Sequence, residues 1–244
     1  MKDSQRQRYA RHLVLPELGE AGQQALLCAR MLVVGTGGLG SPAALYLAAA
    51  GVGTLVLMDG DRVELSNLQR QILHTTAALG RSKVASAADT LAALNPEIDV
   101  RAVPEHFTAS HADLLDDVDF VIDATDNFAS KFLIADLCHA RSTPYCHAGI
   151  RGWHGQAMTV LPGETACVRC LCTDAPPPAA SDAAPAGPVG ALPGVIGSIQ
   201  ALEAIKAIAG CGTLLVNRLL SFDTLPMRFR EIPVPRAADC PLCG

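Results

Sequence analysis

Residues 31–44 read MLVVGTGGLGSPAA, and this segment sets the architecture expected for the whole chain. Its first five residues are a short apolar run that ends in glycine, which is typical of a buried strand. From Leu39 to Ala50 the chain is rich in alanine and leucine, and Ser41-Pro42 provides a favourable helix start. Between strand and helix stands the pattern G-x-G-x-x-G, formed by Gly35, Gly37 and Gly40. The order strand, glycine-rich turn and helix predicts a phosphate-binding loop.

Strand and helix patterns alternate on the C-terminal side of this loop. Strands are expected at 54–59, 98–103 and 119–124, and helices at 82–94 and 128–140. Such alternation indicates βαβ units, so we predict an α/β fold with a Rossmann-like, doubly wound and mainly parallel sheet. Ligands of such sheets bind at the carboxyl ends of the strands.

The flanking regions follow other patterns. The polar N-terminal residues 4–28 have helical spacing and indicate one or two helices. Further on, we expect a strand at 156–162, a buried helix at 195–209 and a β-hairpin made of 218–223 and 227–234. The proline- and alanine-rich stretch 174–193 predicts a long mobile loop. We expect one domain over 1–244, with N-terminal helices (1–28), a nucleotide-binding half (29–150) and a second half (151–244).

Composition excludes several classes of protein. Half of the 244 residues are hydrophobic, only 4% are aromatic and the net charge is −5, which suits layered α/β packing. The chain has no basic block, so nucleic-acid binding is not expected. The charged N-terminus lacks the apolar core of a signal peptide, and no stretch approaches the length of a membrane span. We therefore expect a cytoplasmic protein, not bound to membranes, whose nine cysteines are reduced.

An acidic residue follows the glycine loop at the spacing that nucleotide binding requires. Asp59 ends the second strand, 19 residues after Gly40, where a carboxylate can accept hydrogen bonds from ribose hydroxyls. The loop and this acid occur in binders of NAD and of ATP alike. An NAD-dependent oxidoreductase therefore remains an alternative at this point.

Charged and amide residues near the loop would suit a triphosphate. Arg70 and Lys83 could neutralise its phosphates, Asn67 and Gln71 could donate hydrogen bonds, and Asp126, just after the fourth strand, could hold Mg²⁺. Arginine and lysine are also common as solvated helix charges. These residues alone leave the choice between ATP and NAD open.

Two C-x-x-C pairs stand 69 residues apart and comprise Cys167, Cys170, Cys240 and Cys243. Four thiolates complete a tetrahedral zinc site with no open position, so we predict a structural zinc ion. A thioredoxin-like redox motif would need one pair rather than two, and simple buried thiols are the other alternative.

Several segments together resemble the MoeB/ThiF/HesA group, whose members are relatives of the ubiquitin-activating enzymes. They include LSNLQRQ (65–71), ATDN (124–127), GVIGSIQALEAIK (194–206) and both cysteine pairs, and the resemblance extends from about Arg8 to Cys243. It implies a homodimeric adenylyltransferase that uses ATP-Mg to activate the C-terminal carboxylate of a ubiquitin-like sulfur-carrier protein ending in Gly-Gly. Pyrophosphate would leave, and the adenylate would serve sulfur transfer in molybdopterin or thiamin biosynthesis, with MRFREIPV (227–234) slightly favouring the former.

The resemblance also implies roles for single residues. Asp59 would bind the ribose and Asp126 the Mg²⁺, while Arg11 would reach into the partner subunit's site. The phosphates would be bound by Asn67, Arg70 and Lys83. These four charged side chains, Arg11, Arg70, Lys83 and Asp126, would form the catalytic set. The implied nucleotide-binding residues are Gly35, Gly37, Gly38, Gly40, Asp59, Ser66, Asn67, Arg70, Lys83, Asp126 and Asn127.

One departure from the family pattern concerns the loop at 174–193. Many relatives carry a cysteine there that can link covalently to the carrier, but the matching position is Ala183, and no cysteine stands between Cys172 and Cys211. We therefore expect adenylation without thioester or persulfide chemistry from this loop. The chain also has no rhodanese-like segment, so sulfur is expected from a separate donor protein. A non-catalytic scaffold that binds a carrier is the remaining alternative.

Overall fold

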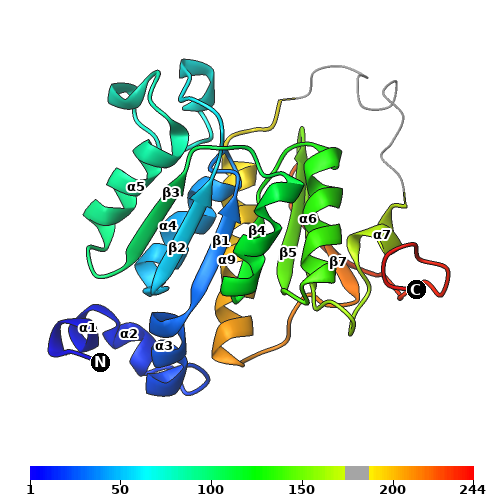
Figure 1. The fold of residues 1–244 in the computed structure, drawn as a ribbon, viewed down its shortest axis with the longest axis horizontal. Coiled ribbons are helices and arrows are strands. Elements are labelled where there is room, and N and C mark those ends of the chain that lie inside the picture. Colours follow the sequence, from blue (N-terminus) through cyan, green and yellow to red (C-terminus); the bar gives the residue numbers. More distant parts are fainter. Residues whose placement is uncertain (174–186) are drawn as a thin grey trace.

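The computed structural model describes residues 1–173 and 187–244. Their strands form one eight-stranded sheet in the order β3-β2-β1-β4-β5-β6-β7-β8 (Figure 1). Within this order, the first five strands (β3, β2, β1, β4 and β5) pair in parallel with their neighbours. The remaining strands β6, β7 and β8 continue the sheet from β5 with antiparallel pairing. The predicted doubly wound, mainly parallel sheet is thus confirmed. The strand bounds are β1 Arg30–Val34, β2 Thr54–Met58, β3 Asp99–Val103, β4 Phe120–Asp123, β5 Tyr145–Arg151, β6 His154–Val160, β7 Arg218–Asp223 and β8 Arg228–Pro233.

Helices cover both faces of the sheet. Helices α3, α4, α5 and α9 pack on one face, and α6, α7 and the 3₁₀ helix η3 pack on the other. Figure 1 shows α6 on the opposite side of the sheet from α4 and α9. The helix bounds are α1 Asp3–Arg8, α2 Ala10–Leu13, α3 Gly19–Cys28, α4 Gly40–Ala50, α5 Lys83–Leu94, α6 Phe128–Ala140, α7 Val168–Leu171 and α9 Ala191–Ala209, with 3₁₀ helices η1 Leu65–Asn67, η2 Thr76–Ala78 and η3 Ala109–Asp117.

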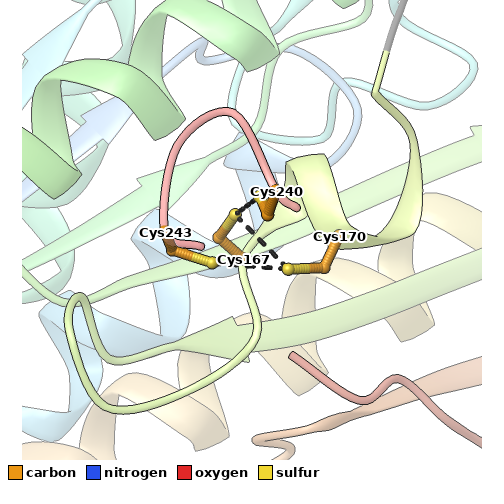
Figure 2. A group of neighbouring side chains, drawn as sticks. All are labelled: Cys167, Cys170, Cys240 and Cys243. Carbon is orange, nitrogen blue, oxygen red and sulfur yellow. Dashed lines mark hydrogen bonds between the residues drawn. The ribbon is translucent and has the colours of Figure 1, made fainter. Parts of the chain in front are cut away.

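The C-terminal residues return to the middle of the chain. Cys240 and Cys243 follow the last strand and lie beside Cys167 and Cys170 of the α7 region (Figure 2). The predicted β-hairpin over 218–234 is present as β7 and β8. The C-terminal part therefore belongs to the same folded unit as the sheet.

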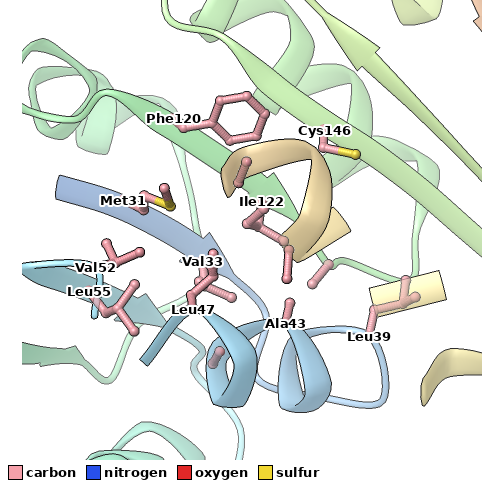
Figure 3. Packing of buried hydrophobic residues seen from close by; sticks show 14 of the residues in the cluster. Met31, Val33, Leu39, Ala43, Leu47, Val52, Leu55, Phe120, Ile122 and Cys146 are labelled. Atoms are coloured by element: carbon pink, nitrogen blue, oxygen red, sulfur yellow. The ribbon is translucent and has the colours of Figure 1, made fainter. Parts of the chain in front are cut away.

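The central strands are apolar because helices bury them from both sides. In β1 and β2 every residue but the first is buried. Figure 3 shows Met31 and Val33 of β1 packed with Leu47 and Ala43 of α4. Small residues along α4 let this helix lie close to the sheet. The turn between β1 and α4, which is the glycine loop, is therefore anchored at both ends in the core.

Several elements differ from the sequence-based prediction. β5 was not predicted, because His147, Gly149 and Arg151 interrupt its apolar pattern, although it lies between the parallel and antiparallel parts of the sheet. The N-terminal region forms three helices rather than one or two. The loop predicted for 174–193 is wrong at 191–193, because α9 begins at Ala191. Pro193 fits there, since the first helical turn leaves backbone N–H groups unpaired. Residues 174–186, which include Ala183, lie outside the described residues.

Helix α9 is also longer than expected. By length and composition alone its 19 residues could cross a membrane, so the expectation that no stretch approaches this length is wrong. In the fold, however, α9 packs on β4, β5, β6 and α4, and it buries Gln200 and Glu203, which are hydrogen-bonded to those elements. It is a core helix of this sheet.

The N-terminal helices pack at the end of the sheet where β1 begins. Tyr9 accepts a hydrogen bond from Asn95 Nδ2 (2.9 Å), and its ring fills the space where a side chain at Gly51 would stand. Gly51 caps the C-terminal end of α4, so this is the end of α4 remote from the glycine loop. Figure 1 likewise shows α1, α2 and α3 below the strands, opposite the segments that follow β1 and β2.

Candidate active site and metal centre

The glycine loop requires glycine where it approaches its neighbours. Gly35 has φ +93°, and a Cβ atom there would lie 2.8 Å from the Ala124 carbonyl oxygen. A Cβ at Gly40 would lie 1.9 Å from the Gly35 carbonyl oxygen. The loop can therefore close only without these side chains. Its contact with Ala124 also places it against the turn that follows β4.

Asp59 is buried at the end of β2 and organises the loop. Its Oδ2 accepts hydrogen bonds from Thr36 N (2.8 Å) and Thr36 Oγ1 (3.1 Å), and its Oδ1 accepts one from Asp61 N (2.9 Å). The predicted contact of Asp59 with ribose stays a prediction. The structure adds a role that the spacing did not indicate, because the carboxylate ties β2 to the glycine loop.

Both predicted phosphate-binding cations lie near the loop. A Cβ at Gly38 would lie 3.4 Å from Arg70 Cγ, so the half-buried Arg70 side chain runs beside the loop. Lys83, the first residue of α5, is only 7% exposed, and its Nζ lies 2.7 Å from Asp61 Oδ2. Asp61 is the one hydrogen-bond partner that the described residues give this ammonium group. A buried ammonium group with donors to spare is suited to an anionic ligand.

The other predicted residues of this edge lie in the segments that follow β2 and β4. Asp126 is exposed between β4 and α6, and Asn127 caps α6 by accepting a hydrogen bond from Ser130 N (2.9 Å). Asn67 Oδ1 accepts one from Glu64 N (3.2 Å), and the Ser66 carbonyl accepts one from Arg70 Nη1 (3.2 Å). The amide of Gln71 is buried against Gly37, and its Oε1 has no partner within the described part of the chain.

A buried ionic cluster supports the turn that carries Asp126. Lys131 Nζ contacts both carboxylate oxygens of Asp123 (3.3 Å each) and donates to the carbonyls of Thr125 (2.7 Å) and Ala148 (2.6 Å). His147 Nδ1 lies 2.8 Å from Asp123 Oδ2. Burial opposes ionisation of Asp123, but Lys131 and His147 outweigh it and hold the pKa of this carboxyl well below its usual range. The sequence-based reasoning missed this cluster.

Arg11 is not brought to the other predicted catalytic residues within one chain. It is exposed on α2, at the end of the sheet opposite the glycine loop. A role for Arg11 at this loop therefore requires a second subunit. That role stays a prediction.

The four predicted cysteines converge as a group that could hold a metal ion. Their sulfur atoms lie within 4.8 Å of one another, with Cys167–Cys170 at 3.9 Å, Cys167–Cys240 at 3.6 Å and Cys170–Cys243 at 3.4 Å (Figure 2). Four sulfurs bound tetrahedrally to zinc at about 2.3 Å would lie about 3.8 Å apart. The cluster therefore has nearly the dimensions of a zinc site.

One further residue at the loop had no predicted role. His74 is buried and contacts the Thr36 carbonyl, which belongs to the glycine loop. It lies only four residues after Arg70, but its distance to Thr36 depends on how α5 and the loop pack. Sequence spacing offers no signal for such a contact.

Comparison with known proteins adds to this geometry. The model of the ThiF family matches residues 9–242. The chain is 43% identical to the SAMP-activating enzyme E1 of Haloferax volcanii, over 99% of this chain and 90% of that protein. It is 44% identical to the sulfur carrier protein ThiS adenylyltransferase of Escherichia coli, over 100% of this chain and 97% of the relative. The crystal structure of E. coli MccB with ATP shares the fold, with a TM-score of 0.87 at 22% identity over 97% of this chain and 74% of that one.

Proposed function

This chain belongs to the ThiF family, and from that membership we propose that it is an ATP-dependent adenylyltransferase that acts on ubiquitin-like sulfur-carrier proteins. It activates their C-terminal glycine carboxylate for thiamin or molybdopterin biosynthesis. Its relatives of more than 40% identity carry the names of activating enzymes and adenylyltransferases, which argues against an NAD-dependent oxidoreductase.

The observation that carries this proposal is the presence of two cations in this region, Arg70 beside the glycine loop and Lys83 beside Asp61, which follows β2. Arg70 runs beside Gly38, and the buried Lys83 has one carboxylate partner for its three donors. A nicotinamide dinucleotide has only two phosphates, each with one negative charge. The β- and γ-phosphates of ATP carry more charge and make better use of two such cations.

The chemistry requires alignment and charge neutralisation more than proton transfer. A carboxylate oxygen of the carrier attacks the α-phosphorus of ATP, the bond from this phosphorus to the bridging oxygen breaks, and pyrophosphate leaves with the bonding electrons. The carboxylate is already a nucleophile, so no general base is needed. Arg70 and Lys83 would stabilise the charge on the leaving pyrophosphate, and the loop N–H groups would orient the phosphates.

The finer assignments belong to the same proposal. Asp126, an exposed carboxylate in the turn beside Gly35, would hold the Mg²⁺ that accompanies ATP, with Asn127 next to it. The cysteine cluster would hold a structural zinc ion. A homodimer would let Arg11 of one subunit serve the partner's loop, and we place the reaction in the cytoplasm with a separate protein as sulfur donor.

The decisive experiment is carrier-dependent exchange of labelled pyrophosphate into ATP. The small subunit of molybdopterin synthase and the thiazole sulfur carrier are tested separately, each beside a form lacking the last glycine. We expect exchange with at least one intact carrier and none with the shortened forms. Asp126→Asn should lower the exchange rate by about a hundredfold or more, as expected for a lost metal ligand. Carrier binding without exchange would instead support the non-catalytic scaffold, and unchanged exchange by Asp126→Asn would refute the metal role.

A further inference from the structure

His74 connects three elements beneath the glycine loop. Its imidazole is only 5% exposed and lies in the segment between η1 and η2. Nε2 lies 3.1 Å from the Thr36 carbonyl oxygen, in the loop, and Nδ1 lies 3.1 Å from Ser86 Oγ on α5. The ring therefore joins α5 to the loop through one hydrogen bond on each side.

The partners of the ring determine where its proton lies. A carbonyl oxygen only accepts, so Nε2 must carry the hydrogen in the bond to Thr36. Burial lowers the pKa of His74, the charge of Lys83 lowers it further, and both outweigh the opposite effects of Thr36 and Asp59. The ring is therefore neutral near pH 7. Its Nδ1 is then an acceptor, and the Ser86 hydroxyl donates to it.

This bond, with a longer one that Ser41 Oγ donates to the same carbonyl (3.4 Å), holds the direction of one peptide group in the loop. The peptide between Thr36 and Gly37 is planar and trans, so its C=O and N–H point in opposite directions. Because the carbonyl points to His74, the Gly37 N–H points away from it. No hydrogen bond among the described residues is donated by this N–H. On the other side of Thr36, Asp59 holds its N–H and hydroxyl.

We propose that His74 is a positioning residue for ATP, whose Nε2–H holds the Thr36 carbonyl so that the Gly37 N–H faces the triphosphate. The inference rests on the proposed function and adds a residue to it. His74 does not touch the nucleotide. It lowers the cost of ordering the loop peptide, and this benefit is the same for bound ATP and for the transition state.

Two amide variants separate the two ring nitrogens. In His74→Gln the longer side chain can place an N–H near the position of Nε2, whereas in His74→Asn the amide reaches only the position of Nδ1. We expect His74→Gln to bind ATP within about threefold of wild type in calorimetric titration. His74→Asn should bind about tenfold more weakly, as expected for one lost hydrogen bond. In carrier-dependent exchange, the loss should appear in KM for ATP while kcat stays within about twofold.

Thr90→Val is the matched control at the same junction. Thr90 Oγ1 lies within hydrogen-bond distance of two carbonyl oxygens, that of Leu73, which precedes His74 (2.9 Å), and that of Ser86, the partner of His74 (3.1 Å). The described residues show no hydrogen bond from Thr90 to the loop. We expect this variant to lower thermal stability and to leave the Kd for ATP unchanged. Equal weakening of ATP binding in His74→Gln and His74→Asn, or in Thr90→Val and His74→Asn, would overturn the inference.

A measurement on the wild-type protein tests the arrangement even if a variant fails to fold. Nitrogen NMR of the labelled chain should show His74 at pH 7 as a neutral ring protonated at Nε2. A ring protonated at Nδ1, or a charged ring, would overturn the inference while leaving adenylation intact. Failure of the proposed function would look different, because wild-type protein would then show no carrier-dependent pyrophosphate exchange, whatever the state of His74.

Discussion

His74 and His147 are buried histidines that are neutral in the folded chain near pH 7. Burial is the largest cause in both cases and lowers the pKa of each ring, and the positive charges of Lys83 and Lys131 lower the two pKa values further. In the unfolded chain each would titrate near pH 6.5. Below that pH the unfolded state binds more protons than the folded state. Stability should therefore be greatest above about pH 6.5 and decrease as the pH falls.

We predict that the free energy of unfolding falls as the pH drops from 6.5 to 5, with a slope that steepens toward an upper limit of about 1.4 kcal/mol per pH unit for each of these histidines. Asp123 acts outside this window, because its lowered pKa gives stability that is lost only as the pH falls below about 4. Urea unfolding at a series of pH values measures the slope. His147→Gln should reduce it, whereas His154→Gln, which changes an exposed ring, should not. A wild-type stability that is flat between pH 6.5 and pH 5 would contradict the prediction.

Helices α4 and α9 approach each other closely beside the glycine loop. A Cβ at Gly197 of α9 would lie 2.2 Å from the Leu39 carbonyl oxygen and 2.6 Å from Pro42 Cγ. Leu39 is part of the loop, and Figure 3 shows its side chain next to the start of α4. The contact between the two helices therefore also fixes the position of the loop.

We predict that Gly197→Ala lowers the free energy of unfolding by about 1–3 kcal/mol and weakens ATP binding. The reason is that the new methyl group would clash with the Leu39 carbonyl and push the backbone of the glycine loop away from α9. Gly194→Ala is the control on the same helix. A Cβ there meets no atom within 4 Å, so alanine should add about 0.5–1 kcal/mol through helix propensity. Chemical unfolding and ATP titration of both variants measure these effects. Equal behaviour of the two variants would refute the role of the close contact.

On the scale of the whole molecule, the cysteine cluster connects the C-terminus to the region between β6 and α9. We predict about one zinc ion per chain and a lower melting temperature after its removal, because the metal stabilises only the folded arrangement. Metal analysis and thermal unfolding before and after chelation measure both quantities. Cys240→Ser should lose the zinc, while Cys211→Ser, outside the cluster, should retain it. A chain that contains no zinc after expression with excess metal would contradict the prediction.

Arg11 lies at the end of the molecule opposite the glycine loop, so its predicted role depends on a second subunit. In a symmetric dimer, each site would combine one subunit's Asp126 with the partner's Arg11. We predict that Arg11→Ala and Asp126→Asn are each nearly inactive and that mixing them restores exchange. Half of randomly mixed dimers carry one intact site, so activity should reach about a quarter of that of wild type.

The mixing experiment requires that subunits swap between dimers. This is achieved by unfolding and refolding the two variants together, or by coexpressing them. Mixing the two folded variants without subunit swapping serves as the control and should restore no pyrophosphate exchange. If mixtures with swapped subunits stay inactive although each variant binds ATP, Arg11 acts within its own chain or has no role in the reaction.

Local patterns in the sequence determined the parts of this protein whose structure depends on neighbouring residues. The apolar run before Gly35, the glycine spacing and the alternation over 54–140 were enough to predict four parallel strands and the helices between them. The two C-x-x-C pairs predicted which sulfurs would meet, because zinc chemistry needs four of them. The resemblance to a family added the nucleotide-binding residues, several of which the fold places along one edge of the sheet.

Only the tertiary structure decided what depends on contacts between distant segments. β5 is a strand because β4 and β6 pair with it, although His147 and Arg151 weaken its own pattern. The pairing of Lys131 with Asp123 and the contact of His74 with Thr36 arise from packing, over distances in sequence that no periodicity encodes. The position of Arg11, far from the loop it is predicted to serve, likewise follows from where the N-terminal helices pack. Such contacts form only when the sheet brings separate segments together, so the spacing of residues along the chain cannot reveal them.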